Sequence, residues 1–156
     1  MEAAQRGPAG SSAAANPGEA QALLGRLEGE QASRRLESGL AEFDRVLGSG
    51  IVPGSVILLG GDPGIGKSTL LLQVAASVAG SAPVLYATGE ESTQQVRARA
   101  RRLGLEAPAL QIVPESDLTR ILATAEQQRV AMLVIDSIQT VFSPEVPSSA
   151  GGVAQL

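Results

Sequence analysis

The chain contains the stretch Gly61-Asp62-Pro63-Gly64-Ile65-Gly66-Lys67-Ser68-Thr69, which matches the phosphate-binding pattern G-x-x-x-x-G-K-[S/T]. An apolar run at 56–59 precedes it and predicts a buried strand, and apolar residues at helical spacing follow it over 70–78. Strand, glycine-rich loop and helix in this order are the context in which the pattern forms a P-loop. The alternative, a glycine-rich turn with a surface lysine, is disfavoured because both flanks are in place. We therefore expect residues 61–69 to bind phosphate.

The residue types in this stretch suit a phosphate ligand. Gly61, Gly64 and Gly66 allow the backbone to wrap tightly with its N–H groups pointing inward, and the N-terminus of the following helix adds donors. Lys67 is expected to place a positive charge against the β- and γ-phosphates, and Ser68 to offer its hydroxyl to Mg²⁺. A nucleotide with Mg²⁺ is thus the predicted ligand.

Composition excludes several other kinds of chemistry. The 156 residues contain no Cys and no His, which removes disulfides, thiol catalysis, a Cys/His zinc site and a His general base. The net charge of -4 argues against binding DNA through bulk charge. No apolar run approaches membrane-spanning length and the N-terminus has no signal-peptide pattern, so we expect a cytoplasmic protein without a membrane partner.

Beyond the P-loop, buried strands and amphipathic helices alternate, which predicts an α/β fold with a parallel sheet and helices on both faces. Residues 1–33 are expected to be a disordered tail or linker with a possible short helix at 20–31, and 34–156 the folded domain. Residues 143–156 predict a mobile loop. The remaining expected elements are an edge strand at 35–39, helices at 40–47, 92–103 and 117–129, and strands at 83–87, 110–113 and 130–135.

Acidic residues follow two of the predicted strands, at the carboxyl ends where ligands of parallel sheets bind. Asp136 ends an apolar run, as a Walker B residue that binds Mg²⁺ would; the alternative is an Asp that caps the next turn. Glu90 and Glu91 follow the strand at 83–87, which we expect beside the P-loop strand. A carboxylate there can polarise the attacking water, but the pair can equally support the next helix N-terminus, and spacing leaves this open.

The helix predicted at 92–103 is basic. At helical spacing two of its arginines share one face and the other two share another. We interpret them as a solvated face rather than as a nucleic-acid site. They are Arg97 with Arg101, and Arg99 with Arg102.

Five stretches occur in this order along the chain: Leu47-Gly48-Ser49-Gly50-Ile51-Val52-Pro53-Gly54-Ser55, residues 60–73, Leu85-Tyr86-Ala87-Thr88-Gly89-Glu90-Glu91-Ser92, residues 99–103, and Val134-Ile135-Asp136-Ser137-Ile138-Gln139-Thr140. Together they resemble the ATPase core of the RadA (Sms) family of bacterial DNA-repair proteins. The resemblance covers about residues 34–156. It implies a RecA-like fold, ATP and Mg²⁺ as cofactors, and hydrolysis that drives branch migration on single-stranded DNA by a homo-oligomeric ring. It also implies that Glu90, rather than Glu91, activates water.

The sequence also departs from that family. The family's four-cysteine zinc finger, its Lys-Asn-Arg-Phe-Gly motif, its Lon-protease-like domain and the last strands of its sheet have no counterpart here, so the resemblance implies a C-terminally incomplete core. Ser49 stands where the family usually has Gly, and residues 150–152 where it usually has Ala-Pro-Gly. Two alternatives stay open: a nucleotide-binding fragment without turnover, and another RecA-like ATPase of the KaiC or replicative-helicase type.

Overall fold

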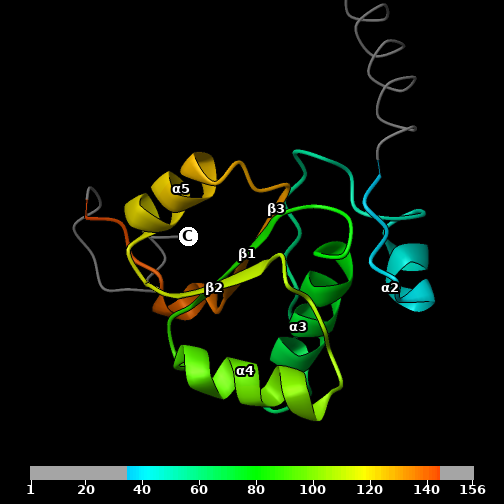
Figure 1. Ribbon diagram of the computed structural model, residues 1–156, viewed down its shortest axis with the longest axis horizontal. Helices are drawn as coiled ribbons and strands as arrows, with labels where there is room; N and C mark the ends of the chain where they lie inside the picture. The colour runs from blue at the N-terminus through cyan, green and yellow to red at the C-terminus, as the bar shows by residue number, and fades with distance from the viewer. Residues whose placement is uncertain (1–34, 145–156) are drawn as a thin grey trace, which may run out of the picture. The chain divides into compact units, whose positions relative to one another are not determined.

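The computed structural model describes residues 35–144. The predictions for residues 1–33, and the end of the loop predicted at 143–156, lie outside the described residues. In chain order the elements are α2 (Ala41–Val46), α3 (Lys67–Val78), β1 (Val84–Thr88), α4 (Thr93–Arg102), β2 (Leu110–Pro114), α5 (Leu118–Gln127), β3 (Met132–Asp136) and the 3₁₀ helix η1 (Ile138–Thr140) (Figure 1).

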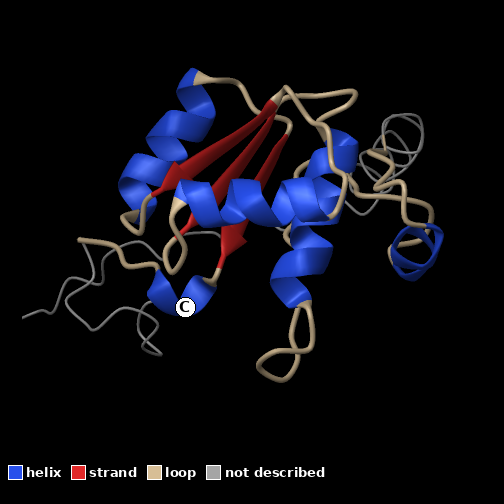
Figure 2. Cartoon of the chain, turned by 60° about the horizontal axis from the view of Figure 1, so that its bottom comes forward, coloured by secondary structure: helices blue, strands red, loops and turns tan. Residues whose placement is uncertain are grey.

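The three strands form a parallel sheet in the order β2-β1-β3, as the alternation of strands and helices predicts. All five residues of the central strand β1 are buried, as expected where both faces of a parallel sheet are covered. Helices α3 and α4 pack on one face and α5 packs on the other (Figure 2). The register places Thr88, at the end of β1, opposite Asp136, at the end of β3.

Aliphatic side chains build the core on both faces of the sheet. The larger cluster joins Val84 and Val134 of the sheet to Leu72 and Val78 of α3, while Ile121 of α5 anchors the opposite face. Each such side chain, when fully buried, contributes about 1.5–3 kcal/mol relative to exposure. With aromatics at only 2% of the sequence, the core depends mainly on burial of aliphatic side chains.

The helix ends follow their sequence signals. Ser92 accepts a hydrogen bond from the Gln95 backbone N–H and Gln95 reaches back to the Ser92 N–H, a capping box that starts α4. Gly104 has φ of 66° just beyond α4, the left-handed conformation typical of a residue that ends a helix. Asp117 caps α5 by accepting from Thr119 N–H. The predictions for these helices are confirmed to within two residues.

The prediction of a strand at 56–59 is wrong. Within residues 35–144 no strand pairs with this run, and Val56 and Leu58 are 98% and 82% exposed. The prediction that β1 adjoins it is also wrong, because β1 pairs with β2 and β3. An apolar run becomes a strand only when a neighbouring strand pairs with its N–H and C=O groups. The edge strand expected at 35–39 is likewise reduced to one antiparallel bridge, Leu36 to Ile51.

The exposed run at 56–59 predicts self-association. An exposed apolar segment and an open sheet edge are features that promote aggregation, and β3 pairs only with β1 among the described strands. We expect size-exclusion chromatography with light scattering to show concentration-dependent association that Leu58→Lys reduces. Leu122→Lys, at a 46% exposed position on α5, is the matched control and should have little effect. A chain that stays monomeric at all concentrations would contradict the prediction.

No helix within residues 35–144 has the length and apolar character needed to cross a bilayer.

Candidate functional site

The P-loop backbone adopts conformations that favour glycine. Gly61, Gly64 and Gly66 have φ of 156°, 79° and 103°. A Cβ built on Gly64 or Gly66 would meet no atom of the described residues within 4 Å, so backbone conformation rather than space explains glycine there. Gly66 is also the N-cap of α3, and within residues 35–144 no side chain caps that end. The first N–H groups of α3 therefore remain available to an anion.

Lys67 holds its ammonium against the P-loop. Lys67 Nζ donates to the carbonyl oxygens of Gly61 and Asp62, at 2.7 and 2.8 Å. Pro63 and Ile65 lie in the exposed part of the loop, and Thr69 is half-buried in the first turn of α3. Of the predicted phosphate-binding residues, 61–66 therefore form an exposed loop and 67–69 form the first turn of α3, with the Lys67 ammonium held against the loop.

Ser68 and Asp136 come together although 68 residues separate them in the chain. Ser68, in the first turn of α3, donates its hydroxyl to Asp136 Oδ1 at 3.0 Å. A hydroxyl and a carboxylate oxygen are ligands that suit Mg²⁺. The described residues hold no cluster of three His, Cys, Asp or Glu side chains, so other ligands would come from phosphate and water, as is usual for Mg²⁺ at nucleotide sites. The residues present fit this ion.

Tyr86 is a site residue that no sequence motif indicates. Its hydroxyl donates to Asp136 Oδ2 at 2.6 Å, so the two carboxylate oxygens of Asp136 have separate donors. Burial, and then the hydrogen bond to Asp136, raise the pKa of the Tyr86 phenol well above its ordinary value, which keeps the donor protonated. The pairing of β1 with β3 is what places Tyr86 at the site. Tyr86 lies opposite Val134, which is two residues before Asp136 and on the same face of the sheet.

Removing the Tyr86 hydroxyl should weaken Mg²⁺ binding. Tyr86→Phe deletes the donor to Asp136 Oδ2 and keeps the ring that packs in the core. Loss of a group that orients a metal ligand typically lowers metal affinity by about 10- to 100-fold. Titrating Mg²⁺ against the binding of a fluorescent ATP analogue measures the shift, and metal-free nucleotide binding is the internal control. An unchanged Mg²⁺ midpoint would show that Tyr86 serves packing alone.

The two adjacent glutamates have different partners. Glu90 is exposed and lies just after β1. It accepts a hydrogen bond at 3.0 Å from the hydroxyl of Ser137, the residue that directly follows Asp136 in the chain. Glu91 instead forms an ion pair with Arg99 of α4, with side chains 31% and 15% exposed. The geometry thus brings Glu90 to the edge that carries Asp136, while Glu91 joins β1 to α4.

Gly89 lets the end of β1 approach η1 closely. Its N–H donates to the Asp136 carbonyl at 3.2 Å. A Cβ at Gly89 would lie 2.0 Å from Thr140 Oγ1 and 2.8 Å from Ser116 Oγ, which is too close for either contact. The absence of a side chain therefore permits the packing that places Glu90 beside Ser137.

Gly89→Ala should destabilise the fold. Relieving the contact with Thr140 requires the backbone to shift, and overpacking of this kind costs about 1–3 kcal/mol. Thermal unfolding followed by circular dichroism should show Tm lower by several degrees per kcal/mol. The matched control is Gly60→Ala, where an added Cβ meets no described atom within 4 Å. Equal melting of both variants would refute the steric argument.

Fold and loop together define a P-loop core of the RecA-like α/β class. The chain belongs to the AAA domain family, whose match covers residues 25–156. Its curated relatives include the bacterial DNA repair proteins RadA of Pseudomonas aeruginosa (54% identical over 122 residues), Escherichia coli (52% over 122) and Bacillus subtilis (49% over 123). Each match covers 78% of this chain and 26% or 27% of the relative, so the chain spans about a quarter of their length. The resemblance to RadA is confirmed.

Proposed function

We propose that this chain is the nucleotide-binding core of a RadA-like DNA-repair ATPase, which binds ATP with Mg²⁺ and hydrolyses it to act on single-stranded DNA. One observation carries the proposal: the Ser68 hydroxyl and the Asp136 carboxylate, distant in sequence, meet at the base of the P-loop. An ordinary glycine-rich turn does not require a hydrogen bond between the residue after its lysine and a carboxylate at the end of an apolar strand. The names of the relatives support the link to DNA repair.

The position of each residue in the proposed site is consistent with one role in binding or hydrolysing ATP. Residues 61–69 bind the phosphates through backbone N–H groups and the Lys67 ammonium. Ser68 and Asp136 would hold Mg²⁺, which would neutralise charge on the phosphates. Glu90 orients the attacking water and accepts its proton, and its hydrogen bond to Ser137 fixes the carboxylate.

The larger assembly is part of the same proposal. The relatives' name supports a role in DNA repair, and we propose further that the protein is a cytoplasmic, ring-forming motor that promotes branch migration. Residues 34–156 would form part of its ATPase domain, and residues 1–33 would be a tail or linker.

A second candidate function is nucleotide binding without turnover. The loop residues 61–66 are all exposed, and Glu90 is exposed as well, so the described residues exclude little water from the reacting groups. Phosphoryl transfer depends on positioning and electrostatic stabilisation, which an open site supplies poorly.

The test is to measure Mg·ATP binding by calorimetry and ATP hydrolysis with and without single-stranded oligothymidylate. Binding with turnover that rises on adding DNA supports the ATPase proposal. Binding without turnover under either condition supports the binding module. A chain that does not bind Mg·ATP would overturn both.

A further inference from the structure

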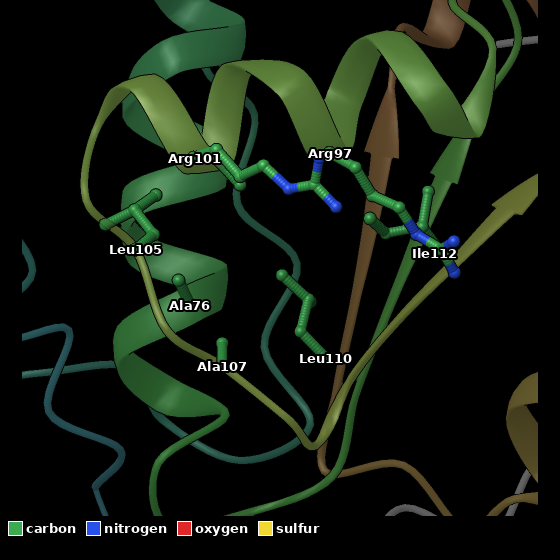
Figure 3. Close-up of a pocket in the computed structure, with 8 residues that line it drawn as sticks. Ala76, Arg97, Arg101, Leu105, Ala107, Leu110 and Ile112 are labelled. Atoms are coloured by element: carbon green, nitrogen blue, oxygen red, sulfur yellow. The ribbon is translucent and has the colours of Figure 1, made fainter.

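A cavity of about 200 Å³ lies between α3, α4 and β2 (Figure 3). None of its lining residues belongs to the P-loop or to the groups around Asp136. Six of its eight lining residues are aliphatic, and the other two are arginines of α4. The lining residues are Ala76, Arg97, Ala100, Arg101, Leu105, Ala107, Leu110 and Ile112.

The cavity lies beside a free edge of the sheet. Strand β2 pairs only with β1 among the described strands, so its outer edge presents unpaired backbone groups. Leu110 and Ile112 alternate along β2 and both line the cavity. A strand added to this edge would place every second side chain on the same face, next to the cavity.

The side chains of Arg97 and Arg101 have no ion pair or hydrogen bond to any residue of the described part of the chain, whereas Arg99 pairs with Glu91. They are four residues apart, and Figure 3 shows both side chains along the part of α4 that overlooks β2. Two exposed guanidinium groups beside several aliphatic side chains favour a ligand that brings a carboxylate and an apolar group together.

The volume of the cavity and the residues that line it indicate which kind of ligand it can bind. Sites for drug-sized ligands measure about 300–1,000 Å³, so a cavity of about 200 Å³ suits one bulky side chain better than a separate small molecule. Nucleic-acid strands are usually held by aromatic side chains that stack on the bases, and none of the residues that line this cavity is aromatic. A protein segment therefore fits better than single-stranded DNA.

We propose that the edge of β2 and this cavity form a docking site for an extended, acidic protein segment. The segment adds to β2, inserts one bulky apolar side chain into the cavity and sets carboxylates against Arg97 and Arg101. The acidic and apolar side chains that contact the site occupy every second position of the segment. This spacing places all of them on the same face of the added strand. The site is independent of the proposed ATPase function.

The probe is the capped peptide acetyl-Glu-Val-Phe-Val-Glu-amide, in which both carboxylates and the ring lie on one face of a strand. It is titrated into the ¹⁵N-labelled chain and followed by ¹H–¹⁵N correlation spectra. We expect chemical-shift changes to concentrate on β2 and α4, at Leu110, Ile112 and the two arginines. The version with Lys in place of both Glu, and the version with Ala in place of Phe, should each bind at least tenfold more weakly.

Variants of the protein distinguish specific binding at the cavity from nonspecific electrostatic attraction to the basic helix α4. Arg97→Glu combined with Arg101→Glu should weaken the acidic peptide roughly tenfold or more. Arg102→Glu is the matched control on the same helix, since Arg102 is exposed and does not line the cavity. Unchanged spectra away from the cavity verify folding of each variant.

Three outcomes would overturn the proposal: no localised shifts at millimolar peptide, equal binding of the lysine peptide, or equal weakening by Arg102→Glu. Oligothymidylate is the competing probe. If it shifts these same residues and the acidic peptide does not, the surface binds nucleic acid and the proposal is wrong.

Discussion

Glu90→Gln is expected to lower DNA-stimulated ATP turnover by about 10²–10⁴-fold, the usual contribution of a general base. ATP affinity should stay the same, because Glu90 accepts from Ser137 and donates nothing to the P-loop. Glutamine preserves the shape and can still bond Ser137, but its amide cannot take a proton from water. Turnover by a coupled assay and affinity by calorimetry measure the two effects separately.

The matched control is Glu91→Gln, one residue along the chain. Glu91 is paired with Arg99 and partly buried, so this substitution should lower stability by about 1–3 kcal/mol, between the values typical of exposed and buried pairs. Its Tm should fall while turnover by the folded fraction persists. If Glu91→Gln abolishes turnover at unchanged Tm and Glu90→Gln does not, the roles of the two glutamates are exchanged.

The elements from α3 to β3 were predictable because their signals are local. Ser92 and Gln95 form a capping box from residues three apart, and Gly104 ends α4 through its own φ. Likewise the first four residues of β1, 84–87, are an unbroken run of apolar side chains, and the strand has the length of a buried strand. The P-loop conformation is also local, since it depends on three glycines within six residues.

Other features depend on neighbours that are distant in sequence. Residues 56–59 have the composition of a strand, but pairing decides whether a run becomes one, and no described strand pairs with it. The bond from Tyr86 to Asp136 depends on the register of β1 against β3. The distinction between Glu90 and Glu91 depends on where Arg99 of α4 lies after folding. Glu90 and Glu91 are adjacent and carry the same charge, so the sequence around them does not indicate which one has which role.

Lys67→Ala is expected to weaken ATP binding by roughly 10- to 150-fold, which corresponds to losing a charged hydrogen bond of about 1.5–3 kcal/mol. Stability should change little, because the ammonium bonds only to Gly61 and Asp62 carbonyls that are exposed and can bond water instead. Calorimetric titration with Mg·ATP measures the affinity and a thermal melt verifies the fold. Arg102→Ala removes the same charge from an exposed position on α4 and should leave affinity unchanged.

The sequence offers a second, direct measurement of the same contact. Lys67 is the only lysine in the chain, so the α-amino group is the only other amine that an acylating reagent can modify. ATP bound at the P-loop should protect Lys67 from acylation, and intact mass spectrometry should then show one adduct fewer. In Lys67→Ala the adduct count should not depend on ATP. If ATP binds with unchanged affinity after Lys67→Ala, or leaves Lys67 unprotected, then the phosphates do not bind at residues 61–69.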